Sequence, residues 1–210
     1  EYGRKARETA KIMKLVDRSI RVTVAGSATP DMPTFPEWDR VVLEHTYDLA
    51  DYLSVHRYYG FDRSAVTETD YLHSYLDLDN FLCSVAATAD YVKALRRSRK
   101  TMMLSLDEWN VWHSHCDRNI VSWDPAPAIL ENRYTLRDGL VFAGMMLTMI
   151  NHADRVKMGC LAQLVNVIAP ILTKPGGETL RQIIYYPYWA GCTYARGQAL
   201  KTTVRTDHYE

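Results

Sequence analysis

The chain has 210 residues, of which 47% are hydrophobic and 24% are charged, a composition that fits a globular domain with a substantial core. Lys and Arg together number 25, as do Asp and Glu, so the formal net charge is zero. This balance gives no support for nucleic acid or an anionic membrane surface as a partner. No apolar run approaches the roughly 20 residues of a membrane-spanning helix. The charged N-terminal segment does not have the pattern of a signal peptide.

The cysteines are far apart in the sequence and form no CxxC pair. They are Cys83, Cys116, Cys160 and Cys192. This spacing predicts reduced thiols rather than a disulfide framework, which favours a cytoplasmic location.

Helices and strands are predicted to alternate along the first half of the chain. Apolar residues at helical spacing indicate helices, and short runs of β-branched or aromatic residues indicate strands. The elements expected in order are a helix over residues 2–16, a strand over 20–25, a helix over 37–46, a strand over 52–55 and a helix over 70–97 with a break near 77–79.

The same alternation continues in the second half. The expected elements are a strand over residues 102–106, a helix over 136–150, a strand over 155–160, a helix after Gly177 that ends near Tyr194 and bends at Pro187, and a new strand over 199–205. Alternating helices and strands predict right-handed βαβ units and a parallel sheet. Four such units make half of a (β/α)₈ TIM barrel. An open doubly wound sheet is the alternative, although no glycine-rich phosphate fingerprint follows any strand.

Polar and aromatic residues follow the predicted strands, most clearly after residues 102–106. Asp107 and Glu108 come directly after this apolar run, and Trp109 and Asn110 follow them. Burying carboxylates is costly unless they are paired or used, and barrel enzymes keep catalytic groups at the carboxyl ends of their strands. The alternative is that these acids simply meet solvent where the strand emerges. Because successive side chains of a strand point to opposite faces, Asp107 is expected to lie between sheet and helices if Glu108 faces the site.

Two longer motifs resemble a known family. SLDEWNVW at 105–112 and CLAQLVNVIAPI at 160–171 closely resemble the family 51 glycoside hydrolases, the α-L-arabinofuranosidases. Shorter runs resemble the same family, namely MKLVD at 13–17, MPTFPEW at 32–38 and HADRVK at 152–157. The resemblance covers essentially the whole chain.

The resemblance implies roles for five residues. The glutamate of DEWN is the family's catalytic nucleophile, which corresponds to Glu108. The HxY motif after the sixth strand corresponds to His56 and Tyr58, near the nucleophile. Gln163 of AQLVN and Trp112 of DEWNVW are then expected to line the substrate pocket. The family's general acid/base lies in an Asn-Glu pair after the fourth barrel strand, and this chain contains no such pair.

The implied protein is a retaining α-L-arabinofuranosidase that acts on arabinoxylan, arabinan or derived oligosaccharides. Residues 1–195 would form the C-terminal half of the catalytic barrel, and residues 196–210 would begin a C-terminal β-sandwich domain. The implied enzyme needs two carboxyl groups, and we predict no cofactor and no metal. We also predict a homo-oligomer for the full-length protein and no activity for the isolated fragment. A xylosidase or endoglucanase of the same barrel type and an inactive sugar-binding half-domain remain alternatives.

Two other residue groups have competing interpretations. His113, His115, Cys116 and Asp117 contain metal-ligating side chains, but without the usual spacing of zinc ligands, so a solvated loop is favoured. The aromatic run at 185–189 could form a sugar platform, but packing in the core between the barrel and the next domain is favoured.

Overall fold

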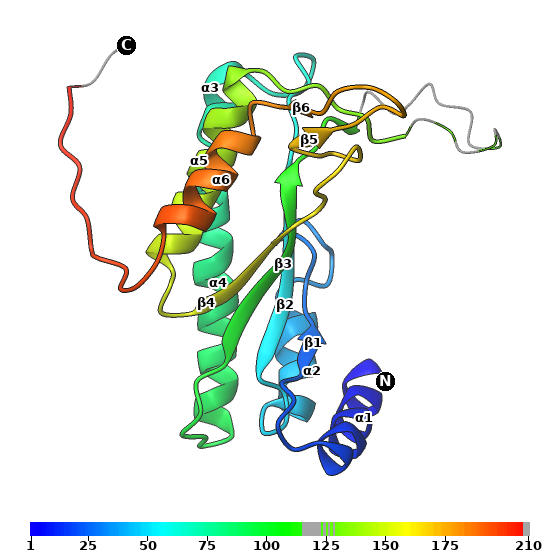
Figure 1. Cartoon of the computed structure of the whole chain (residues 1–210). Coiled ribbons are helices and arrows are strands. Elements are labelled where there is room, and N and C mark those ends of the chain that lie inside the picture. Colours follow the sequence, from blue (N-terminus) through cyan, green and yellow to red (C-terminus); the bar gives the residue numbers. More distant parts are fainter. Residues whose placement is uncertain (115–122, 124, 126, 128, 208–210) are drawn as a thin grey trace.

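A four-stranded parallel sheet forms the centre of the computed structural model, which describes residues 1–114, 123, 125, 127 and 129–207 (Figure 1). The strand order is β1-β2-β3-β4, and every pairing is parallel. The strands are β1 (Thr23–Ala25), β2 (Tyr52–Tyr59), β3 (Met103–Val111) and β4 (Val156–Leu161). The predicted α/β class and the parallel sheet are confirmed, and the arrangement is consistent with part of a TIM barrel.

Helices α4, α5 and α6 pack together on one side of the sheet (Figure 1), whereas α1 packs on α2. The helices are α1 (Tyr2–Val16), α2 (Glu37–Thr46), α3 (Glu68–Leu72), α4 (Ser74–Leu95), α5 (Leu136–Asn151) and α6 (Tyr185–Tyr194). The predicted bounds of α1, α2 and α5 agree with the structure to within one residue. Among the described residues, no helix is both long and apolar enough to cross a membrane.

Alternating apolar residues of the central strands form the core beneath these helices. Leu53 and Val55 of β2 and Leu104 and Leu106 of β3 are fully buried in one cluster with α4 residues such as Phe81. Removing a leucine side chain of this kind from water contributes about 2 kcal/mol to folding. Residues that alternate with these, such as Ser54 of β2 and Ser105 of β3, point to the opposite face of the sheet, away from the helices.

Four predicted elements differ from the structure in their bounds. Strands β2 and β3 continue to Tyr59 and Val111 instead of ending at residues 55 and 106, so their polar residues lie within strands. The long helix is interrupted at His73, not near 77–79. The last helix begins only at Tyr185, so Pro187 falls in its first turn, where a missing N–H costs no helical hydrogen bond.

The segment after β4 contains a hairpin that the sequence analysis missed. It consists of β5 (Ile171–Leu172) and β6 (Leu180–Arg181), which pair antiparallel. The strand predicted over 199–205 is wrong, since these described residues form no regular element and are exposed. The described cysteines, Cys83, Cys160 and Cys192, are free thiols, and they are exposed at the surface. Cys116 lies outside the described residues.

Candidate active site at the carboxyl end of the sheet

A β-bulge in β3 places two carboxylates on one face of the sheet. In the pairing with β2, Val55 lies opposite Leu106 but His56 lies opposite Glu108, so Asp107 is an extra residue. An extra residue of this kind re-aims the side chains that follow it. The expectation that Asp107 lies between sheet and helices is therefore wrong.

Glu108 receives its contacts from β2. The Tyr58 hydroxyl donates a hydrogen bond to Glu108 Oε2 at 3.1 Å, and His56 Nδ1 lies 3.5 Å from the same oxygen. Burial and the negative charge of Glu108 raise the pKa of Tyr58, so the phenol stays protonated and remains a donor. The Glu108 side chain is 50% exposed, which leaves its other oxygen accessible to a ligand.

Asp107 holds the other side of His56. Asp107 Oδ1 lies 3.1 Å from His56 Nε2 and accepts a hydrogen bond of 2.7 Å from the Ser54 hydroxyl. Asp107 Oδ2 accepts a further bond from Ser105. The imidazole is therefore held between two carboxylates, with Asp107 fixing its orientation. Sequence reasoning did not identify Ser54, Ser105 or this role of Asp107, because each depends on the bulge.

Trp112 lies beside Tyr58 because the ends of β2 and β3 approach each other closely. The Trp112 backbone N–H donates to the Tyr59 carbonyl at 2.7 Å, and a Cβ on Gly60 would lie only 2.3 Å from the Trp112 carbonyl oxygen. Glycine is thus required at position 60. The rings of Tyr58 and Trp112 meet edge to face, with centroids 5.7 Å apart. Both residues line a hollow of about 310 Å³ at this end of the sheet.

Gln163 lies at the same end of the sheet, just beyond β4. Asn110, fully buried, donates from its side chain to the carbonyl of Ala162 at 2.8 Å and to the carbonyl of Ile168. These two bonds hold the loop that carries Gln163 beside β3. The Gln163 side chain is exposed, and among the described residues no hydrogen bond joins it to Glu108. The structure thus joins Glu108, His56, Tyr58 and Trp112 directly and brings Gln163 to the neighbouring strand end.

His113, a residue of the metal hypothesis, bonds to protein groups on both ring nitrogens. His113 Nδ1 accepts from the Phe61 backbone N–H at 3.1 Å, and its Nε2 lies 3.2 Å from Asp138 Oδ1. The other residues of this metal hypothesis, His115, Cys116 and Asp117, lie outside the described residues. For the aromatic run at 185–189, the favoured prediction of core packing holds only for Tyr188, which packs near Trp109 and Phe142 on the helix side of the sheet. Tyr186 and Trp189 are exposed.

Comparison with known proteins shows which proteins this chain resembles. A family model described as the α-L-arabinofuranosidase C-terminal domain matches residues 107–210. Over the whole chain, the sequence is 51% identical to the intracellular exo-α-(1→5)-L-arabinofuranosidase 1 of Bacillus subtilis and 50% identical to the intracellular exo-α-(1→5)-L-arabinofuranosidase of Halalkalibacterium halodurans. The chain spans 42% of the length of each of these relatives.

Solved structures of α-L-arabinofuranosidases also resemble this chain. A family 51 α-L-arabinofuranosidase from Bifidobacterium longum superposes with a TM-score of 0.86 at 34% identity, covering 94% of this chain and 41% of that chain. An α-L-arabinofuranosidase from Thermotoga maritima, solved as an arabinose complex, gives a TM-score of 0.72 at 29% identity, covering 89% of this chain and 34% of that chain.

The parallel α/β sheet and the carboxylate site at its carboxyl end place this chain in the class of glycoside hydrolases with such a sheet. Within that class, the chain belongs to the α-L-arabinofuranosidases of family 51, of whose length it represents a part.

Proposed function

We propose that the protein containing this chain is a retaining exo-α-L-arabinofuranosidase that releases terminal arabinofuranosyl residues from arabinan, arabinoxylan or derived oligosaccharides. The observation that carries this proposal is the environment of Glu108. Its carboxylate is half exposed at the carboxyl end of the sheet, accepts a hydrogen bond from Tyr58 and lies beside His56. The relatives named above supply the substrate class.

In this proposal Glu108 is the nucleophile. Its free oxygen attacks the anomeric carbon and breaks the glycosidic bond, while the general acid/base protonates the departing aglycone oxygen. Water, deprotonated by the same acid/base, then hydrolyses the glycosyl–enzyme ester with net retention of configuration and frees Glu108. Tyr58 and His56 hold Oε2, so that the other oxygen stays directed at the sugar. Retaining enzymes need a second carboxyl group about 5 Å away as general acid/base. We assign that group to a part of the full-length protein outside these 210 residues.

The remaining site residues are proposed to bind the substrate. Trp112 and Tyr58 offer an aromatic wall beside the hollow, and aromatic faces suit the C–H surface of a sugar ring. Gln163 offers an amide donor and acceptor at the end of the neighbouring strand. We further propose that the protein is intracellular, as the names of the B. subtilis and H. halodurans relatives state for those proteins.

The domain division is also part of the proposal. Residues 1–195 form the second half of a (β/α)₈ barrel, and residues 196–210 lead into a following β-sandwich domain. Support comes from exposure, since every described residue from Cys192 onward is exposed and the segment after α6 lies apart from the sheet (Figure 1).

The test is a substrate comparison with the full-length protein. Aryl α-L-arabinofuranosides should be hydrolysed with a kcat/KM at least about 100-fold above that for aryl β-xylosides and β-glucosides. The Glu108→Gln variant, assayed in parallel, should show no preference because it should not turn over. Equal or higher activity on xylosides or glucosides would refute the arabinofuranosidase assignment while leaving a glycosidase.

A further inference from the structure

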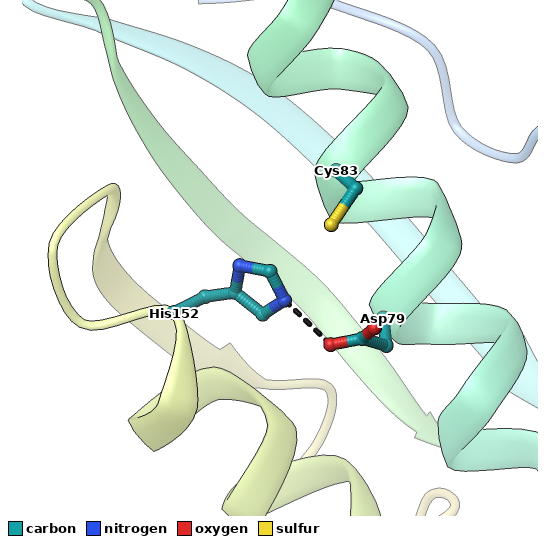
Figure 2. Close-up of side chains that lie close together, drawn as sticks. All are labelled: Asp79, Cys83 and His152. Atoms are coloured by element: carbon teal, nitrogen blue, oxygen red, sulfur yellow. Dashed lines mark hydrogen bonds and ion pairs between the residues drawn. The ribbon is translucent and has the colours of Figure 1, made fainter. Parts of the chain in front are cut away.

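Three metal-ligating side chains gather on the helix side of the sheet, on helices that carry none of the site residues described above. Asp79 and Cys83 belong to α4, and His152 is the C-cap residue of α5. Each offers one ligand atom, and these atoms all lie within 4.8 Å of one another. Figure 2 shows Asp79 and His152 joined by a hydrogen bond and the Cys83 thiol directed toward the imidazole.

The backbone around the cluster is fixed by local structure. Asp79 and Cys83 are four residues apart on α4, so their side chains share one helix face. The His152 backbone N–H donates to the Thr148 carbonyl, and its own carbonyl accepts from the N–H of Val156 at the start of β4. The backbone of all three residues is therefore held in place by regular hydrogen bonds.

Close packing of α4 on α5 holds the two helices together. A Cβ on Gly144 of α5 would lie 3.1 Å from the Tyr75 side chain, and the Thr148 hydroxyl donates to the Tyr75 carbonyl at 3.4 Å. Because this packing is tight, small side-chain rotations rather than helix movements must adjust the cluster to a ligand.

The donor set and its size fit a tetrahedral ion. With zinc bond lengths of about 2.0–2.3 Å, the ligand atoms of a tetrahedral site are ~3.3–3.6 Å apart. The hydrogen bond of 2.7 Å between His152 Nε2 and Asp79 Oδ1 must widen slightly, and the longest separation of 4.8 Å must shorten. Both adjustments are about 1 Å and fall within rotamer motion. Three protein ligands would leave a fourth position for water.

The local charge also favours a cation. The negative charges of Asp79 and Asp154 both act on the Cys83 thiol, which is exposed at the surface. Thiolate and imidazole together select borderline-soft ions such as Zn²⁺ over Mg²⁺ or Ca²⁺.

We propose that Asp79, Cys83 and His152 form a binding site for one divalent transition-metal ion, with Zn²⁺ as the preferred ion, that links α4 to the end of α5. Binding releases the thiol proton to solvent and involves no redox step. The site is separate from Glu108, so the proposal stands independently of the glycosidase assignment.

The test is cobalt binding to the metal-free full-length protein. One equivalent of Co²⁺ should produce a thiolate-to-cobalt charge-transfer band that Zn²⁺ displaces. Cys83→Ser should remove this band, whereas the matched control Cys192→Ser, at another exposed cysteine, should keep it. His152→Ala should weaken the Kd for Co²⁺ at least about 10-fold. A band that persists in Cys83→Ser, or no band in the wild type, would overturn the proposal.

Thermal unfolding separates a metal site from a simple ion pair. Saturating Zn²⁺ should raise the Tm of the wild type by several degrees and leave that of Cys83→Ser unchanged, because only the wild type binds the ion. Serine is close in size to cysteine and position 83 is exposed, so this variant should fold. The cluster is only an ion pair if two results are found together. Zn²⁺ changes the Tm of neither the wild type nor Cys83→Ser, and His152→Ala lowers the Tm by the same amount with and without Zn²⁺.

Discussion

Two clusters among the described residues each combine a histidine, a tyrosine and an acid, but they differ in exposure. At the carboxyl end of the sheet, His56 and Tyr58 contact Glu108, whose side chain is 50% exposed. At the N-terminus of α5, His113 and Tyr71 contact Asp138, whose side chain is 3% exposed. Asp138 also accepts bonds from the Thr135 backbone and hydroxyl and so completes the capping box of α5.

The difference shows what separates a reaction site from a structural network. The Asp138 carboxylate has protein donors on both oxygens, so none of its lone pairs faces a ligand. Glu108 has donors on one oxygen and an accessible second oxygen. A histidine, an acid and a tyrosine thus do not define a site by themselves; the accessible lone pair does.

The largest effect is expected from Glu108→Ala in the full-length protein. Turnover of an aryl arabinofuranoside should fall by at least about 10⁴-fold with little change in substrate affinity, because the lost group acts in the transition state. Added azide should partly restore activity and give the glycosyl azide of inverted configuration. Kinetics with and without azide, followed by product NMR, measure this.

The control for this prediction is the neighbouring acid. Asp107→Ala should misplace His56 but should not respond to azide, because Asp107 bonds to His56, Ser54 and Ser105 rather than facing the ligand. Azide rescue of Asp107→Ala together with none for Glu108→Ala would reverse the assignment of the nucleophile.

Substitution in the Asp138 cluster should lower the stability of the fold rather than the activity. Asp138→Ala leaves the Tyr71 hydroxyl and the Thr135 N–H without their acceptor, which should cost about 3 kcal/mol of unfolding free energy and lower Tm on the order of 10 °C. Asp70→Ala is the matched control, since Asp70 also bonds a helix-capping threonine but is exposed. It should cost less than about 1 kcal/mol. Equal losses in the two variants would mean that burial of the network contributes nothing.

The sequence predicted the helices and the parallel sheet because the buried side of each element repeats. Apolar spacing on α2 and α5, and the apolar runs of β2 and β3, reflect one continuous core. The predicted strands β2 and β3 were too short, because the sheet face opposite the helices becomes polar toward the site. His56 and Tyr58 in β2 and Glu108 in β3 interrupt the apolar pattern without ending the strand.

The details of the site could be predicted only in part. The residues that meet Glu108 were identified through family resemblance, not from periodicity. The bulge at Asp107 leaves no signal in a single strand, because it arises from the pairing between β2 and β3. The role of Asn110 likewise depends on Ala162 and Ile168, over 50 residues away in the chain. The β5–β6 hairpin has strands of two residues, too short for any periodic pattern.

A smaller effect on catalysis is expected from Tyr58→Phe. The variant removes one donor to Glu108 Oε2 but keeps the ring that meets Trp112. Losing a hydrogen bond to a charged group should lower kcat about 10- to 100-fold and leave KM nearly unchanged. Tyr58→Ala, which also removes the ring, should raise KM as well. A Tyr58→Phe enzyme with full kcat would show that the bond does not contribute to the reaction.

The smallest expected effect is an acid-dependent loss of stability at Asp138. Burial alone would raise the pKa of Asp138, but hydrogen bonds from His113, the Thr135 backbone and Tyr71 outweigh burial and lower it to about 2. An ordinary Asp titrates near 3.9 in the unfolded chain, so the stabilisation is present above about pH 4 and is lost as the pH falls toward 2. It amounts to about 2 kcal/mol and should appear as a shrinking difference in unfolding free energy between wild type and Asp138→Asn from pH 5 to 2.5.

Asp39 is the opposite case, because burial raises its pKa despite its bonds from Ser27. Acidification should therefore favour the wild type over Asp39→Asn, and a difference that moves in the same direction at both positions would contradict the assigned environments.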